Sequence, residues 1–312
     1  MNKMKKIGLT ALAASLVSVS AQAVDISGGS SLTYASGNDG VAGNPWSMND
    51  SLTFSWGGEL DNGFTVDMSF LLDNSDGAAS QIFDNRTLAI GMGDAGTLTF
   101  WGQAGSGVVG SFDDRTPNAY EESWNSGDSP NQGHSASNMF YYTNAMDALT
   151  VHGSYTPAGT SAYDASAELG VVVTAIDSLE LYGAVGTDNA SVNEVDNTIM
   201  GLKYTIGGAT IGLQQNEADS AAANGDEDFQ AWSISYAVSE DVSVSYGQSK
   251  IKYETAGTED QDATGISASY TMGSMTVAGV VNSIDNQGSA ATGAGNTTTN
   301  NDTFEINLSF AF

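Results

Sequence analysis

The stretch Phe304–Phe312, FEINLSFAF, alternates between apolar residues and small or polar residues up to the last position of the chain. Its apolar members are Phe304, Ile306, Leu308, Phe310 and Phe312, and Glu305, Asn307, Ser309 and Ala311 lie between them. Successive side chains of a β-strand point to opposite faces, so this period of two predicts a strand with one apolar and one polar face.

The same period runs through most of the preceding chain and predicts sixteen strands. We place them at roughly 25–34, 48–60, 63–73, 82–92, 97–104, 137–143, 149–155, 164–174, 179–187, 196–205, 209–217, 228–237, 242–253, 262–271, 275–284 and 302–312. Seven short turns, mostly of Gly, Asn, Asp or Ser, alternate with eight longer loops. This order is typical of an all-β, up-and-down antiparallel barrel in an outer membrane. Val172 departs from the pattern, because it is apolar at a polar position.

A soluble β-sandwich or β-helix would also show alternating strands and glycine-rich turns. A sandwich, however, packs its apolar faces together in a dry core. A membrane barrel uses both faces, since lipid covers the outside and water fills the inside. Here the second face consists of Ser, Thr, Asn, Gln, Asp and Gly, and the last strand ends on an aromatic residue. Both features favour the barrel.

Residues 1–23 have the pattern of a signal peptide. Three lysines precede an apolar run that ends at Val19, and Ala21-Gln22-Ala23 fits a cleavage site. We therefore expect an exported protein with one barrel domain over residues 24–312. The absence of cysteine excludes a disulfide framework. No later apolar run is long enough for a transmembrane helix.

The charge balance is strongly acidic. Three of the eight Lys and Arg residues lie in the first 23 residues, which hold none of the 37 Asp and Glu residues, so the remainder carries five against 37, or about −32. This argues against nucleic acid and anionic membrane surfaces as partners. It is compatible with cations as partners, or with an acidic shell suited to a saline medium.

The segment Gly105–Ala136 shows neither a strand period nor a helix period. A segment of this length without secondary structure is usually functional in a compact domain. We expect it to fold into the space that the strands enclose, where its carboxylates would attract cations. The candidate constriction residues are Asp113, Asp114, Arg115, Glu121, Glu122 and Asp128. The alternatives are a surface loop, acids that merely accept backbone hydrogen bonds, and an Arg115 that pairs with Asp113 and Asp114.

Polar residues on the second face of the strands should line the same space. These are Asp67, Asp73, Gln103, His152, Glu168, Glu180 and Lys203. Arg86 instead shares the parity of its apolar neighbours, so it should lie beyond the apolar band, past a bulge or at a subunit contact. The acidic run Asp226, Glu227 and Asp228 is a possible calcium site, without EF-hand spacing. No enzyme motif is present, and we expect neither catalysis nor another cofactor.

Two motifs resemble Gram-negative general porins. The terminal FEINLSFAF is similar to the end of outer-membrane barrels, and the resemblance implies that Phe304, Phe310 and Phe312 form the assembly signal. The stretch Asn85–Gln103, NRTLAIGMGDAGTLTFWGQ, resembles the hairpin that precedes the family's pore loop. Family members often place a basic residue where this chain has Gln103, and the usual Pro-Glu-Phe-Gly-Gly run is absent here. The resemblance implies a homotrimer in a Gram-negative outer membrane.

From these features we expect an outer-membrane porin for passive diffusion of small hydrophilic solutes and ions, with a preference for cations. Its other partner would be the outer-membrane lipid. One alternative is a substrate-specific channel of the same fold, for which Tyr120 and Trp124 could form an aromatic contact surface. The other is a non-conducting surface or adhesion barrel with a sealed lumen.

Overall fold

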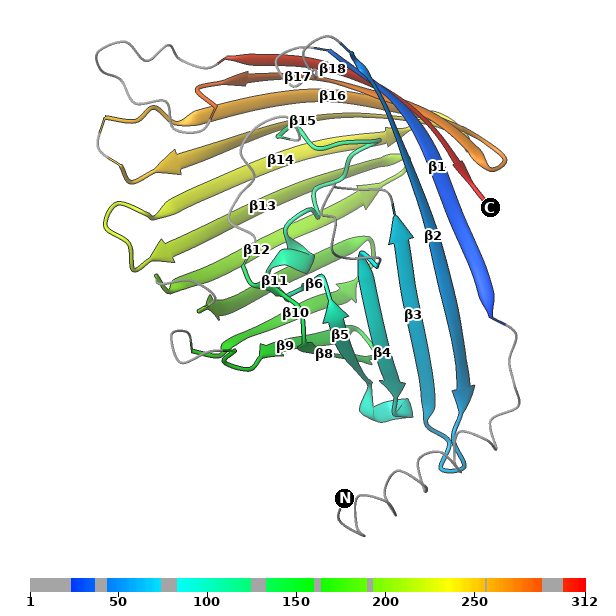
Figure 1. Ribbon diagram of the computed structural model, residues 1–312. Helices are drawn as coiled ribbons and strands as arrows, with labels where there is room; N and C mark the ends of the chain where they lie inside the picture. Colours follow the sequence, from blue (N-terminus) through cyan, green and yellow to red (C-terminus); the bar gives the residue numbers. More distant parts are fainter. Residues whose placement is uncertain are drawn as a thin grey trace.

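The computed structural model describes residues 24–36, 44–73, 83–124, 133–159, 164–189, 193–255, 257–287 and 300–312. Sixteen antiparallel strands form a closed barrel, in which β1 completes the ring by pairing with β18 (Figure 1). The predicted sixteen-stranded barrel is therefore confirmed. The predicted signal peptide, residues 1–23, lies outside the described residues.

The barrel strands are β1 (Asp25–Ser36), β2 (Trp46–Glu59), β3 (Thr65–Asp73), β4 (Asn85–Gly91), β5 (Thr97–Gln103), β8 (Met139–Met146), β9 (Leu149–Thr156), β10 (Ser166–Ile176), β11 (Leu179–Asp188), β12 (Val195–Ile206), β13 (Ala209–Ser220), β14 (Glu227–Ala237), β15 (Val242–Tyr253), β16 (Gln261–Met272), β17 (Met275–Asp285) and β18 (Asn301–Ala311). Two short strands, β6 (Gly105–Ser106) and β7 (Ser135–Ala136), form a separate ladder. The 3-10 turns are η1 (Gly93–Ala95) and η2 (Gly110–Phe112).

The terminal stretch closes the barrel. Strand β18 pairs with β1 from Ala311 opposite Gly29 to Phe304 opposite Ser36. Beyond the strand, the Phe312 amide donates to the Gly28 carbonyl at 2.9 Å, and the Gly28 amide donates to the Phe312 carbonyl at 3.0 Å. Closure pairs the two edges that an open sheet would leave exposed.

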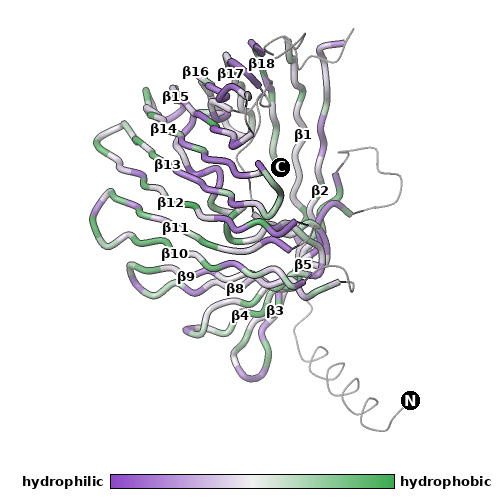
Figure 2. Tube along the Cα trace, turned by 90° about the vertical axis from the view of Figure 1, so that its left-hand side faces the viewer, coloured by the Kyte–Doolittle hydropathy of each residue, from purple (hydrophilic) through white to green (hydrophobic). Residues whose placement is uncertain are grey.

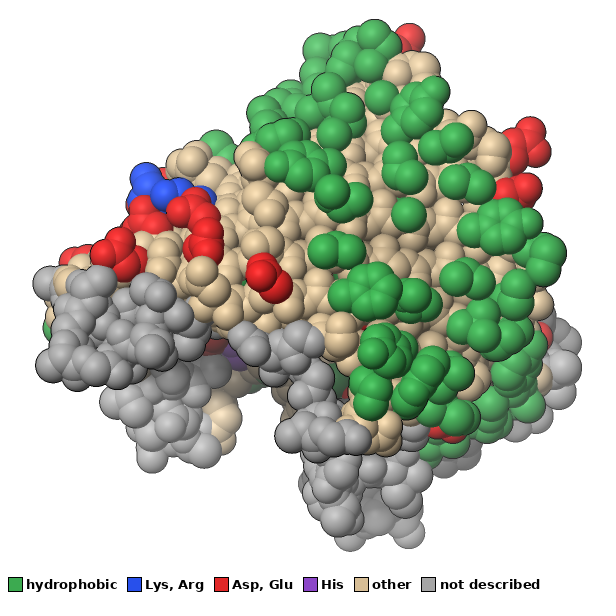
Figure 3. Space-filling view, turned by 90° about the horizontal axis from the view of Figure 1, so that it is seen from above, with side chains coloured by type: hydrophobic (Ala, Val, Ile, Leu, Met, Phe, Trp, Pro, Cys, Tyr) green, Lys and Arg blue, Asp and Glu red, His purple; other side chains and the backbone are tan. Residues whose placement is uncertain are grey.

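Large apolar side chains cover the outside of the barrel. Exposed examples on successive strands are Leu169, Val185, Met200, Leu213, Trp232, Val244, Ile266, Val281 and Phe310. Figure 3 shows hydrophobic side chains spread over the outer face, with Lys and Arg beside acidic side chains at its left edge and further acidic side chains at its right edge. Both colours of the hydropathy scale recur along strands such as β11 and β12 in Figure 2, as the alternating sequence requires. An apolar surface of this extent is what a barrel presents to lipid.

Arg86 lies beside a β-bulge on the neighbouring strand β5. Thr87 pairs with Trp101 but Arg86 pairs with Gln103, so Gly102 is an extra residue on β5. Arg86 is exposed, and its Nη2 lies 3.5 Å from the Gly102 carbonyl. Among the described residues, no helix is long and apolar enough to cross a membrane.

Candidate functional site in the barrel lumen

Residues 107–134, between β6 and β7, form a segment that we call the lumen loop; residues 107–124 and 133–134 of it are described. Its base is closed by the β6–β7 ladder and by the Gly107 amide, which donates to the His134 carbonyl at 2.8 Å. Its described residues contact inward-facing side chains of the wall from β8 round to β18, so the segment runs inside the barrel rather than over its surface (Figure 1).

Glu168 fixes the base of the lumen loop to β10. The residue is only 2% exposed. Its carboxylate accepts hydrogen bonds from the Val109 amide at 3.0 Å and from the His134 amide at 2.7 Å. The Ser154 hydroxyl adds a third donor at 3.1 Å. Glu168 faces inward as predicted, but its carboxylate is occupied by three hydrogen-bond donors. It therefore anchors the lumen loop and does not present its charge to the lumen. Across the loop base, His134 Nδ1 lies 2.8 Å from Asp188 Oδ1.

An apolar cluster holds the first turn of the lumen loop. Phe112 is buried together with Val108 and Val109 against Val172 and Tyr182. The Phe112 ring also meets His152, with ring centroids 5.2 Å apart in an edge-to-face arrangement. Val172, which interrupts the alternation of β10, is therefore apolar because the lumen loop covers it from the inside.

Asp113 serves as a second anchor. It is 1% exposed, accepts a hydrogen bond from Asn216 Nδ2 at 2.9 Å, and its carbonyl accepts one from Gln214 Nε2. The sequence predicts Asp113 at the constriction, but in the structure it is buried against the wall. The Asn216 amide donates to one carboxylate oxygen, and burial removes the acid from the aqueous lumen.

Arg115 pairs with Glu180, and not with Asp113 and Asp114 as the alternative interpretation had it. Arg115 Nη2 and Lys203 Nζ each lie 3.0 Å from the same oxygen, Glu180 Oε1. The guanidinium also stacks over the Phe112 ring at 4.8 Å and the Tyr182 ring at 5.0 Å. These two cation–π contacts add to the ion pair that holds the guanidinium.

Serines of three adjacent strands hold the middle of the lumen loop. The Ser233 hydroxyl donates to the Pro117 carbonyl at 2.7 Å, Ser245 accepts the Ala119 amide at 2.9 Å, and Ser267 accepts the Tyr120 amide at 3.1 Å. We call Ser233, Ser245 and Ser267 the serine track. Beside it, glycine lets the loop backbone approach the wall: a Cβ on Gly265 would lie 2.8 Å from Ser123 Cα.

Residues 107–124 of the lumen loop end in a second apolar cluster. Trp124 is 4% exposed and packs edge-to-face on Phe229, with ring centroids 5.0 Å apart, next to Ala231 and Ile251. Tyr120 donates its hydroxyl proton to the Glu305 carboxylate on β18. Trp124 is thus a packing residue, which removes one of the two aromatic side chains expected for a substrate-specific channel.

Three acids of the lumen loop keep contact with the open space. Asp114 is exposed, and Glu121 and Glu122 are partly exposed. Partial burial raises the pKa of all three carboxyls, and for Glu121 burial followed by the neighbouring Glu122, Glu305 and Asp114 raises it to about 7. The Asn118 amide donates to Glu122 at 2.6 Å, which favours the ionised form of that carboxyl. Together with Glu305, these residues form the acidic cluster.

The remaining predicted lumen residues lie at separate places. Asp67 on β3 faces inward beside Gly57, and Asp73 shares its parity at the end of the strand. Gln103 donates to the Phe83 carbonyl beyond the bulge. His152 contacts the Tyr141 hydroxyl at 3.0 Å. Asp128 lies outside the described residues.

Calcium binding stays a prediction. In the described part of the chain, no three His, Cys, Asp or Glu side chains group closely enough to hold a metal ion. Asp226 accepts the Ser220 amide at 2.9 Å, while Glu227 and Asp228 pair with successive residues of β13 and so point to opposite faces. Glu305, the serine track and the His134–Asp188 contact were not singled out from the sequence, although the serines share the polar parity of three consecutive strands.

Comparisons with known proteins agree with this architecture. OmpT, an outer membrane protein of Vibrio cholerae, is 15% identical with a TM-score of 0.72, covering 95% of this chain and 100% of its own. A mutant porin of Rhodopseudomonas blastica is 17% identical (TM-score 0.66; 93% and 100%), and an anion-selective porin from Comamonas acidovorans is 14% identical (0.68; 93% and 99%). None of the curated proteins matches the sequence.

A family model described as Gram-negative porin matches residues 8–312, almost the whole chain. This match agrees with the closed barrel, its apolar exterior and its internal loop. It also indicates a channel rather than an enzyme, and a location in the outer membrane. The chain belongs to the Gram-negative porin family.

Proposed function

We propose that this outer-membrane channel lets small hydrophilic solutes and ions diffuse passively through a water-filled lumen, with a preference for cations. The observation that carries the proposal is the placement of the five basic residues beyond position 23. Arg86, Lys250 and Lys252 lie on the outward parity of their strands. Only Arg115 and Lys203 face inward, and both share the single carboxylate of Glu180.

The inward acids outnumber these two cations. The acidic cluster presents Asp114, Glu121, Glu122 and Glu305, and Asp67 adds a carboxylate on the opposite wall. In the described lumen, none of the ion pairs involves Asp114 or Glu121. Fixed negative charge in a narrow aqueous passage concentrates cations and repels anions. The lumen loop supplies the narrowing, because it occupies the inner face of β8–β16.

The fold alone does not decide the sign of the selectivity, since the porin from Comamonas acidovorans is described as anion-selective. The preference must therefore come from the side chains of this chain. We also propose a homotrimer, because a solved form of the Vibrio cholerae protein is described as a trimer.

The test is the reversal potential of the refolded barrel in a planar bilayer under a potassium chloride gradient. Stable single-channel current steps, with a reversal potential whose sign shows preference for cations, support the proposal. The Asp114→Asn/Glu121→Gln/Glu122→Gln variant should reduce that potential. An anion-sign potential from the wild-type channel would refute the cation preference. A folded barrel without conductance would point to the sealed-lumen alternative, and block by a solute at low concentration would point to a substrate-specific channel.

A further inference from the structure

A concavity of about 440 Å³ lies in the inner face of the wall formed by β1–β4, beside the short turn that joins β2 to β3. At its centre is Gly57, which pairs with Asp67 of β3. A Cβ on Gly57 would collide with Asp67 Oδ1, so the carboxylate leans over the space that a side chain would otherwise fill. The volume is within the range of roughly 300 to 1,000 Å³ that is typical of small-molecule sites.

Hydroxyl groups of three neighbouring strands lie next to this carboxylate on the same face. Ser55 of β2 pairs with Ser69 of β3, and Ser69 pairs with Thr87 of β4. This row is two residues along the strands from the row of Gly57 and Asp67, a spacing that one small solute can bridge. Since a hydroxyl group both donates and accepts hydrogen bonds, the row matches the hydroxyl groups of a solute.

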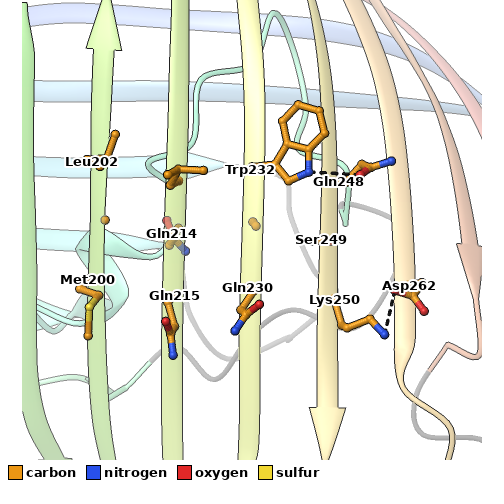
Figure 4. Close-up of a pocket in the computed structure, with 13 residues that line it drawn as sticks. Met200, Leu202, Gln214, Gln215, Gln230, Trp232, Gln248, Ser249, Lys250 and Asp262 are labelled. Carbon is orange, nitrogen blue, oxygen red and sulfur yellow. Dashed lines mark hydrogen bonds and ion pairs between the residues drawn. The ribbon is translucent and has the colours of Figure 1, made fainter.

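The carboxylate at the centre of the concavity is available for a cation. Asp67 is exposed, and none of the ion pairs among the described residues involves it. The groove on the outer face over β12–β16 differs in this respect, because Lys250 there pairs with Asp262 at 3.3 Å (Figure 4). Asp25 and Glu59 also line the concavity and add negative charge. In the part of the chain that the structure describes, however, no three acidic side chains group closely enough to hold a metal ion, which favours an organic ammonium group.

We propose that this concavity is a transit subsite for hydroxylated amines such as amino sugars, with the ammonium group bound by Asp67. The hydroxyl groups of the solute contact Ser55, Ser69 and Thr87. The short turns of outer-membrane barrels lie on the periplasmic side, so this subsite is near the periplasmic mouth of the channel. The inference rests on the proposed function, because it names a solute class for the same lumen.

The experiment measures how strongly glucosamine blocks the current of single channels in a planar bilayer. Glucose, which lacks the amine, and methylammonium, which lacks the hydroxyl groups, are the comparison solutes, and glucosamine should block at the lowest concentration. Gly57→Ala fills the concavity but leaves every charge in place, and it should weaken the block about tenfold, the effect expected for losing a hydrogen bond to a charged group. The matched control is Gly29→Ala on the same inner face, where a Cβ would meet the Phe310 carbonyl at 3.0 Å, and its block should equal that of the wild type.

Three outcomes would overturn the subsite: no block by glucosamine, equal block in the wild type and in Gly57→Ala, or block by glucose or methylammonium as strong as block by glucosamine. Should Gly57→Ala fail to fold, Asp67→Asn removes the charge at nearly constant shape, and the same loss is expected. In a barrel that does not conduct, equilibrium binding of glucosamine to the detergent-solubilised protein replaces the current, with the same variants.

This inference and the proposed cation preference fail in different ways. A reversal potential whose sign shows preference for anions, with the glucosamine block intact, would refute the cation preference alone. A potential that shows preference for cations, with a block that Gly57→Ala does not change, would refute the subsite alone.

Discussion

The wall of β8–β16 and the wall of β1–β5 have the same outward alternation but differ on their inner faces. Against β8–β16 the lumen loop buries Phe112 and Trp124 and uses carboxylate, amide and hydroxyl partners from successive strands. The inner face of β1–β5 carries small polar side chains such as Ser31, Thr53 and Ser69, and carboxylates such as Asp67. One wall is adapted to hold a peptide segment, and the other to contact water.

This difference agrees with the position of the two buried apolar clusters on the inner face, which both lie under the lumen loop. Two apolar seats, meaning wall positions against which the lumen loop packs, hold the loop. One contains Val172 and Ile199, and the other contains Phe229 and Ile251. Between the seats, the wall is hydroxylated and glycine-rich, so the loop backbone lies close to the strands. The described part of the loop lies against the inner faces of β8–β18, and under the proposed function solutes pass between it and the β1–β5 wall.

Removing both apolar anchors should have the largest effect. The variant Phe112→Ala/Trp124→Ala loses about 3 to 5 kcal/mol of packing at each site, so we expect the lumen loop to leave the wall. Single-channel conductance should rise about twofold or more, because the narrowing is lost. Phe54→Ala, an outward aromatic on β2, is the control and should leave conductance unchanged. An unchanged conductance in the double variant would mean that the loop does not narrow the pore.

Glu180→Gln should have the next largest effect, on selectivity and not on conductance. It leaves Arg115 and Lys203 without their shared carboxylate, 3.0 Å from each, and adds uncompensated positive charge to the loop side. We expect the cation-to-anion permeability ratio to fall by about half or more. Asp67→Asn removes the same charge from the facing wall but releases no cation, so its effect should be smaller. Equal effects of the two variants would contradict the role of the Glu180 pairs.

Cation preference should rise with pH through about 7, the pKa of Glu121. A carboxyl is neutral below its pKa and charged above it, so raising the pH adds negative charge beside Glu122, Asp114 and Glu305. Reversal potentials measured from about pH 5 to about pH 9 should show this step, and Glu121→Gln should abolish it. Asp67→Asn should shift the whole curve without removing the step. A step that survives in Glu121→Gln would assign the titration to another group.

The sequence predicted the barrel well, because a period of two and alternating loop lengths depend only on neighbouring residues. Boundaries moved by a few residues, as at β8, predicted over 137–143 and found at Met139–Met146. The partners of the loop acids were harder to predict. Asp113 is 103 residues from its partner Asn216, and Arg115 is 65 residues from its partner Glu180. These contacts therefore depend on barrel closure and on the path of the loop. Val172 was the one local sign of that path.

The serine track should give the smallest effect. Ser267→Ala removes the acceptor for the Tyr120 amide at 3.1 Å and the contact with Ser245 at 2.6 Å, a loss of about 1 kcal/mol. With both apolar anchors intact the loop should stay on the wall, so mean conductance should hardly change while brief current fluctuations become more frequent. Ser31→Ala on the β1–β5 wall is the matched control and should leave the current trace as in the wild type. If both serine variants fluctuate equally, the hydroxyls do not hold the loop. If Ser267→Ala opens the channel as far as the double anchor variant, then hydrogen bonds, and not the apolar seats, fix the loop.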